Sequence, residues 1–146
     1  MLRKIMSFLL FFLVLLPTLG WTQSERFTVG GEISFTKTGD LYVELVTKQE
    51  FESDKPSPFE LVLKIVPEDI EKGKMSFTFH NVPQGTYGMQ CFQDVNGNGK
   101  LDTGMFGPKE PWGNYRPKRP SFRGPKFEEI AFRLEKDTID IQIEVK

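Results

Sequence analysis

Residues 94 to 102, DVNGNGKLD, place oxygen-bearing side chains at alternate positions of one short segment. Numbered from its first aspartate, the segment has oxygen side chains at positions 1, 3 and 5, glycine at 6, a backbone carbonyl at 7 and a carboxylate at 9. This spacing matches the first nine positions of an EF-hand calcium loop, whose alternate residues aim hard oxygen ligands at one ion. The predicted Ca²⁺ ligands are Asp94, Asn96, Asn98, the Lys100 carbonyl and Asp102.

Two departures from that motif lower the expected affinity. Position 12, where a bidentate glutamate normally closes the ligand sphere, is Met105, and no amphipathic helix precedes the loop. Asp102 or Glu110 must then supply the missing oxygen. With so few carboxylates we expect a weak structural site, with a Kd of roughly 10⁻⁴ to 10⁻³ M. The alternative is that the two Asn-Gly pairs only form left-handed turns and bind no metal.

The segment from 105 to 129 is the second candidate region. It has five prolines, three glycines, five aromatic residues and no alternation, and such long connections are usually functional. Arginines between aromatic rings can stack on sugars or grip anionic groups. The candidate ligand-binding residues for a glycan or an anionic envelope component are Trp112, Tyr115, Arg116, Lys118, Arg119 and Arg123. The alternative is that the aromatic side chains plug one open end of the fold while the charges face water.

An enzymatic role has little support in the residue inventory. The only histidine, His80, lies on the polar face of its segment, and the only cysteine, Cys91, alternates with buried-type residues. Neither a nucleophile–base pair nor a zinc set can be assembled from them. A hydrolase that uses paired carboxylates from Asp94, Asp102 or Glu110 is the remaining enzymatic alternative.

The elements that must position these residues are short segments with a period of two, which is typical of half-buried strands. Residues 32–36 and 41–46 are predicted to form a hairpin, and 49–58 a loop because it contains two prolines. Residues 67–74 allow one short helical turn. The predicted inward side chains of the last strand are Ile139, Ile141, Ile143 and Val145. About seven strands predict an all-β sandwich, with a small barrel as the competing fold.

The N-terminus predicts export. Arg3 and Lys4 precede an apolar run from Ile5 to Leu16, which is typical of a secretory signal peptide and shorter than the roughly 20 residues that span a bilayer. Cleavage after Gly20 or Thr22 would leave one soluble domain, residues 23–146, in the periplasm or outside the cell. A single cysteine cannot form an internal disulfide, so the core must hold the domain together. The acidic balance disfavours nucleic acid as a partner, and we expect a monomer.

The stretches GTYGMQCFQDVNGNGKLDTGMFGPKEPWGNY and PSFRGPKFEEIAFRL resemble exported bacterial proteins grouped as domain of unknown function family 2141. The matching residues are Gly85, Thr86, Tyr87, Asp94, Asn96, Gly97, Asn98, Gly99, Asp102, Phe106, Gly107, Glu110, Gly113, Pro120 and Phe122. The resemblance implies an immunoglobulin-like or transthyretin-like sandwich and pairs Glu110 with the Asp94 loop. The basic run at residues 115–119 departs from the family pattern. We therefore expect a non-catalytic binding or structural module of the cell envelope.

Overall fold

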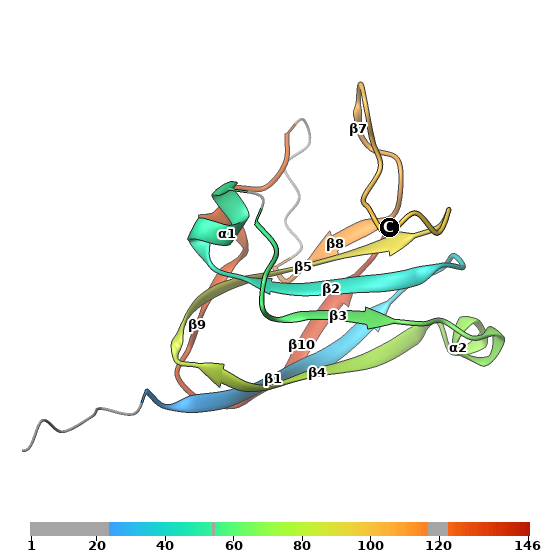
Figure 1. The fold of residues 1–146 in the computed structure, drawn as a ribbon. Helices are drawn as coiled ribbons and strands as arrows, with labels where there is room; N and C mark the ends of the chain where they lie inside the picture. The colour runs from blue at the N-terminus through green and yellow to red at the C-terminus, as the bar shows by residue number, and fades with distance from the viewer. Residues whose placement is uncertain (1–23, 54, 117–122) are drawn as a thin grey trace, which may run out of the picture.

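The computed structural model describes residues 24–53, 55–116 and 123–146. The predicted signal segment 1–22 lies outside the described residues, as do Lys118 and Arg119. Across the described part the chain forms two main β-sheets, one two-stranded hairpin and three short helices (Figure 1). No helix among the described residues is long and apolar enough to cross a membrane.

The first sheet has three strands in the order β10-β1-β4. Strand β1 (Arg26–Ser34) lies in the middle, antiparallel to β4 (Lys74–Pro83) and parallel to β10 (Thr138–Glu144). The parallel pairing is possible because β1 and β10 come from opposite ends of the chain, so no tight turn has to join them.

The second sheet has the order β3-β2-β5-β8. It contains β3 (Glu60–Leu63), β2 (Asp40–Val46), β5 (Gly85–Asp94) and β8 (Trp112–Asn114). Strand β9 (Ala131–Leu134) pairs with the first half of β5, while β8 pairs with its second half. Strand β5 is therefore the central strand, and it delivers Asp94 to the edge of the sandwich.

The remaining elements are short. A two-stranded hairpin, β6 (Thr103–Gly104) with β7 (Gly107–Pro108), projects beyond the sheets, with Met105 and Phe106 exposed at its tip (Figure 1). Helices α1 (Lys48–Ser53) and α3 (Phe127–Ile130) lie together through an aromatic contact between Phe51 and Phe127. Helix α2 (Pro67–Lys72) ends at Gly73, which adopts a left-handed conformation.

The core lies between the two sheets, where the alternate apolar residues of both meet. Its fully buried members are Val29, Ile33, Leu41, Val43, Leu45, Val82, Met89, Leu134 and Ile141. Open sheets packed in this way define a β-sandwich, and the strand order of the described residues does not close into a barrel. The predicted fold class is thus confirmed. Cys91 is buried and His80 exposed, as their alternation predicted.

The predicted hairpin between residues 32–36 and 41–46 is wrong. Strands β1 and β2 belong to different sheets, and residues 35–39 cross from one sheet to the other. Alternation shows which side chains face the core, but the inner faces of two facing sheets have the same pattern. The pattern therefore identifies strands without identifying their partners.

Three other local expectations need correction. Ile139 is 68% exposed because a register shift between β1 and β10 precedes Ile141 and turns Ile139 outward. The predicted loop 49–58 begins within α1. The segment 105–129, expected to be irregular, contains β7, β8 and α3, which are too short for a periodic pattern.

Candidate functional site

Asp94 closes the turn that follows β5. Its Oδ1 accepts hydrogen bonds from the backbone N–H groups of Gly97 (2.7 Å) and Asn98 (3.1 Å), and its Oδ2 accepts one from Gly99 (2.7 Å). Gly97 and Gly99 have positive φ angles of 76° and 74°, which allow the chain to curl around this carboxylate. Burial raises the pKa of Asp94, but the N–H groups of Gly99, Gly97, Asn98 and Asn96 outweigh burial and lower the pKa overall.

Asp102 meets the two asparagines of the same loop. Its carboxylate accepts hydrogen bonds from Asn96 Nδ2 (2.6 Å) and Asn98 Nδ2 (3.2 Å). The amide oxygens of the asparagines accept backbone N–H groups in turn, at 3.1 Å from Asn98 and 2.9 Å from Lys100. The backbone of Lys100 thus lies within the curled loop.

Glu110 folds back onto this loop from beyond the β6–β7 hairpin. It is 7% exposed, and its Oε1 accepts the N–H of Val95 (2.8 Å) while its Oε2 accepts the N–H of Asp102 (3.0 Å). The N–H of Lys109 also donates to the Asp102 carbonyl at 2.7 Å. One buried carboxylate thus joins the start of the loop to its end. We call residues 94–110 the carboxylate loop.

The predicted metal residues therefore share one loop, but hydrogen bonds already hold them. Among the described residues no group of three or more His, Cys, Asp and Glu side chains is arranged to hold a metal ion. Both amide nitrogens point at Asp102, where an ion would require oxygens. Met105, at position 12, is 92% exposed at the hairpin tip.

Of the predicted ligand-binding residues, the structure describes Trp112, Tyr115, Arg116 and Arg123, and these four have different surroundings. Tyr115 packs edge-on against Phe132 of the core with ring centroids 5.3 Å apart, and the Arg116 guanidinium lies 5.9 Å from the Tyr115 ring centre. Arg123 forms two hydrogen bonds of 2.7 Å with Glu129. Trp112 lies on β8 beside a hollow of the second sheet.

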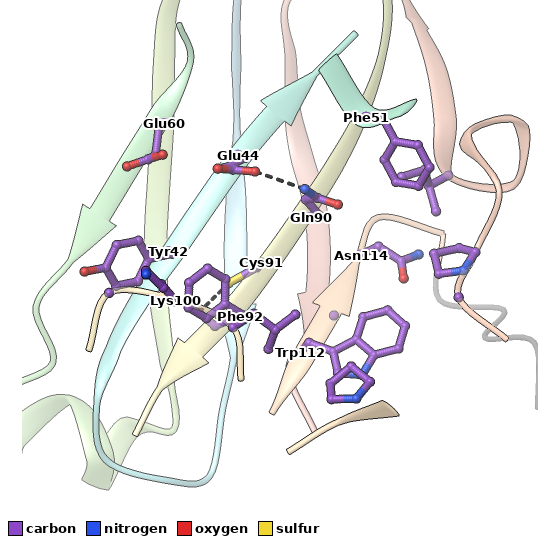
Figure 2. A pocket seen from close by; sticks show the side chains of 17 residues that line it. Tyr42, Glu44, Phe51, Glu60, Gln90, Cys91, Phe92, Lys100, Trp112 and Asn114 are labelled. Carbon is purple, nitrogen blue, oxygen red and sulfur yellow. Dashed lines mark hydrogen bonds between the residues drawn. The ribbon is translucent and has the colours of Figure 1, made fainter. Parts of the chain in front are cut away.

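That hollow lies on the outer face of the second sheet, and sequence reasoning missed most of its residues. It is lined mainly by Tyr42, Glu44, Gln90, Phe92, Trp112 and Asn114 (Figure 2). The signal was present in the outward positions of β2 and β5, where Tyr42, Gln90 and Phe92 stand beside the charged Glu44. Only the inward positions of these strands entered the prediction.

These features define an all-β sandwich with a loop closed by buried carboxylates. The chain belongs to the family described as uncharacterized protein conserved in bacteria (DUF2141), whose model matches residues 34–142. The match includes β2 through most of β10 and therefore the whole carboxylate loop. No curated protein and no solved structure matches the chain.

Proposed function

We propose that the protein is an exported, non-catalytic β-sandwich module of the cell envelope whose carboxylate loop binds Ca²⁺ weakly as a structural ion. The observation that supports this is the return of Glu110 to the loop that begins at Asp94. Three carboxylates then converge on one curled loop: those of Asp94 and Glu110 accept backbone N–H groups, and that of Asp102 accepts the side-chain amides of Asn96 and Asn98. An ion bound there would supply charge neutralisation and fix the loop.

The donor chemistry fits calcium with one adjustment. The residues that would hold the ion are Asp94, Asn96, Asn98, Asp102, Glu110 and the Lys100 carbonyl. All of these offer hard oxygen atoms, which calcium prefers. The side-chain amides of Asn96 and Asn98 would have to turn, so that their oxygens replace the nitrogens that now face Asp102. This required rearrangement supports a weak site.

The experiment is a calcium titration of the full chain by calorimetry and thermal unfolding. Asp102→Asn is the informative variant. The Asp102 carboxylate accepts hydrogen bonds from the side-chain amides of Asn96 and Asn98 and from no backbone N–H group in the described contacts. Its replacement should therefore weaken ion binding without removing the backbone hydrogen bonds of the turn. Asp140→Asn, an exposed acid on β10, is the matched control.

Millimolar calcium should raise the melting temperature of the wild type and of Asp140→Asn, because an ion that binds only the native state stabilises it by mass action. Asp102→Asn should respond far less. Identical melting curves of the wild type in calcium and in chelator, with no heat of binding, would refute the site.

Two observations favour a non-catalytic role over the hydrolase alternative. The carboxylates of Asp94 and Glu110 are both occupied by backbone N–H groups, and the lowered pKa of Asp94 makes it a poor proton donor near neutral pH. His80 lies on β4 of the other sheet, away from the loop. A glycoside-hydrolysis screen with Glu110→Gln as control tests this alternative, and turnover lost in that variant would establish it.

Export is tested separately by mass spectrometry of the protein from its native host. We expect a mature N-terminus at Trp21 or Gln23, which follows from the predicted cleavage sites. A chain that still begins at Met1 would contradict export through a cleaved signal.

A further inference from the structure

The hollow on the outer face of the second sheet has the dimensions of a small-molecule site. Its volume is about 640 Å³, within the range of roughly 300–1,000 Å³ that is usual for ligand pockets. Phe51 of α1 and Ile130 of α3 border one end, and Lys100 and Leu101 of the carboxylate loop border the other. We call this feature the outer-face trough (Figure 2).

The strand register arranges the floor of the trough in two rows. One row is apolar and runs across four strands as Val62, Tyr42, Phe92 and Trp112, of which the last three line the trough. The next row is polar and runs as Glu60, Glu44, Gln90 and Asn114. Because neighbouring strands are about 4.8 Å apart, each row extends for roughly 14 Å. A ligand in the trough would therefore meet aromatic rings along one edge and hydrogen-bonding groups along the other.

The aromatic row is pre-arranged by contacts within it. Tyr42 and Phe92 stack with ring centroids 4.8 Å apart and planes 9° apart. Their rings lose little freedom when a ligand binds, which lowers the entropic cost of association. In the polar row the Gln90 Nε2 donates to the Glu44 carboxylate at 3.0 Å, and this orients both groups (Figure 2).

Asn114 supplies the observation that points to a ligand. Its side-chain amide donates to the backbone carbonyls of Tyr115 (3.2 Å) and Arg116 (3.0 Å), which fixes the nitrogen on that side. The opposite atom, Oδ1, is buried and has no hydrogen-bond partner among the described residues, and Asn114, which is only 3% exposed, lines the trough. Exchanging the two amide atoms would set an oxygen against two carbonyls. Asn114 therefore holds, at the wall of the trough, a fixed acceptor that lacks a donor among the described residues.

The chemistry of the polar row selects among ligand classes. Two of its four residues, Glu44 and Glu60, are carboxylates that line the trough, so an anionic ligand on that row would meet like charges. A quaternary ammonium could lie on the aromatic rings, but it has no hydrogen to donate to Asn114. A sugar has both apolar C–H faces for the rings and hydroxyl groups for the carboxylate and amide row.

We propose that the outer-face trough binds a neutral saccharide, with Tyr42, Phe92 and Trp112 against its ring faces and Glu44, Gln90 and Asn114 on its hydroxyl groups. This deepens the proposed role as an envelope module and rests on it, but it does not depend on the calcium ion. The trough differs from the ligand-binding set that the sequence suggested, since Trp112 is the one member of that set that lines it among the described residues.

The test uses the full chain with Trp21→Phe, which leaves Trp112 as the only tryptophan. Maltotriose, cellotriose and chitotriose are titrated separately, and binding is followed by Trp112 fluorescence and by the side-chain NMR signals of Asn114. We expect at least one trisaccharide to bind saturably and to shift the Asn114 amide signal. Gln90→Leu and Phe92→Leu should each weaken binding about tenfold or more. Thr78→Val, exposed on the outer face of the other sheet, should leave binding unchanged.

Three results would overturn the proposal. The first is that none of the three sugars changes the Trp112 fluorescence or the Asn114 signals. The second is that Gln90→Leu and Phe92→Leu bind the sugar as tightly as the unsubstituted protein. The third is that the protein responds to choline and not to the sugars. Repeating the titration in chelator separates this proposal from the calcium site. If the protein binds a saccharide but does not respond to calcium, only the proposed calcium site is refuted. If it responds to calcium but binds no saccharide, only the proposed saccharide site is refuted.

Discussion

Gly39 lies directly against the backbone of Asp94, where the chain enters the second sheet. A Cβ atom on Gly39 would overlap the carbonyl oxygen of Asp94, and Gly39 has a φ of 121° that side chains rarely adopt. The buried amide of Gln93 donates to the carbonyls of Lys37 (2.7 Å) and Gly39 (3.4 Å) and holds the same crossing. The start of the carboxylate loop and the crossing between the sheets therefore form one structural unit.

Gly39→Ala should be strongly destabilising. The added methyl group meets rigid backbone and the φ angle is strained, so we expect a loss of about 3 kcal/mol or more in the free energy of unfolding. The matched control is Gly97→Ala, where φ is also positive but nothing lies within 4 Å of the added atom. Gly97→Ala should cost only about 1 kcal/mol. Urea unfolding measures both, and equal losses would show that the contact with Asp94 is unimportant.

Tyr87→Phe tests a second motif of the family. The Tyr87 hydroxyl donates to the Pro83 carbonyl at 3.0 Å, across the turn that carries the chain from β4 to β5. Burial raises the pKa of Tyr87, so the hydroxyl remains a donor across the physiological range. A Cβ on Gly85 would lie 3.0 Å from the Tyr87 ring, which explains the glycine two residues earlier.

Removing this hydroxyl should cost about 1 kcal/mol, since it leaves a carbonyl in a partly buried turn without its donor. Tyr42→Phe, on the outer face, should change stability by less than about 0.5 kcal/mol. Thermal unfolding of the two variants side by side decides the point. If Tyr87→Phe were as stable as Tyr42→Phe, the hydrogen bond from the Tyr87 hydroxyl to the Pro83 carbonyl would contribute nothing to stability.

Much of the sandwich was predictable because period-two alternation is a direct result of having one buried face. In the last strand it identified Ile141, Ile143 and Val145 as core residues without any knowledge of pairing. Strand partners were not predictable, because they depend on contacts between segments far apart in the chain. Strands β6, β7 and β8 have two or three residues each, which is too few to show a repeated alternation.

The candidate site divides in the same way. The turn around Asp94 follows from local spacing, since each contact spans at most five residues. The link from Glu110 to Val95 spans fifteen residues, and local spacing offered Glu110 only as an alternative to Asp102, while the family resemblance paired it with the loop. The outer-face trough joins side chains of β2, β5 and β8, so its two rows exist only once the register is known.

Glu129 should make stability depend on pH in acid. Two hydrogen bonds from Arg123 and one from the Lys126 backbone lower the pKa of Glu129 from 4.5 to about 2. Because the folded-state pKa is depressed, the stabilisation is present above pH 4.5 and is lost as the pH falls towards 2. NMR titration of the Glu129 carboxyl carbon measures this directly.

Glu129→Gln should therefore be less stable than the wild type at about pH 6, and the difference should shrink by about pH 3. Because the pair is exposed to solvent, salt should also reduce the difference. Glu71→Gln on α2 is the exposed control. A stability gap between Glu129→Gln and the wild type that does not vary with pH would refute the assigned role.

Cys91 should be unreactive in the native protein. It is 3% exposed on the inner face of β5, and burial raises the pKa of its thiol, so little thiolate is present at neutral pH. We expect no reaction with a thiol reagent until urea unfolds the chain, and then complete reaction. Rapid modification of the folded protein would show that β5 opens locally or that the core differs from this description.

Glu110→Gln tests the closure of the carboxylate loop without any ion. A glutamine can accept only one of the two N–H groups that Glu110 now holds, and it turns its own NH₂ towards the other. The unsatisfied donors should cost about 1–3 kcal/mol in the free energy of unfolding.

Hydrogen exchange in chelator measures the closure of the loop. In Glu110→Gln the amide hydrogens of Val95 and Asp102 should exchange about tenfold faster or more, while those of the β1–β4 pair keep their protection. Glu135→Gln, exposed and distant, should leave all of these rates unchanged. If the Val95 and Asp102 rates were equally unchanged in Glu110→Gln, the carboxylate would not be what joins the two ends of the loop.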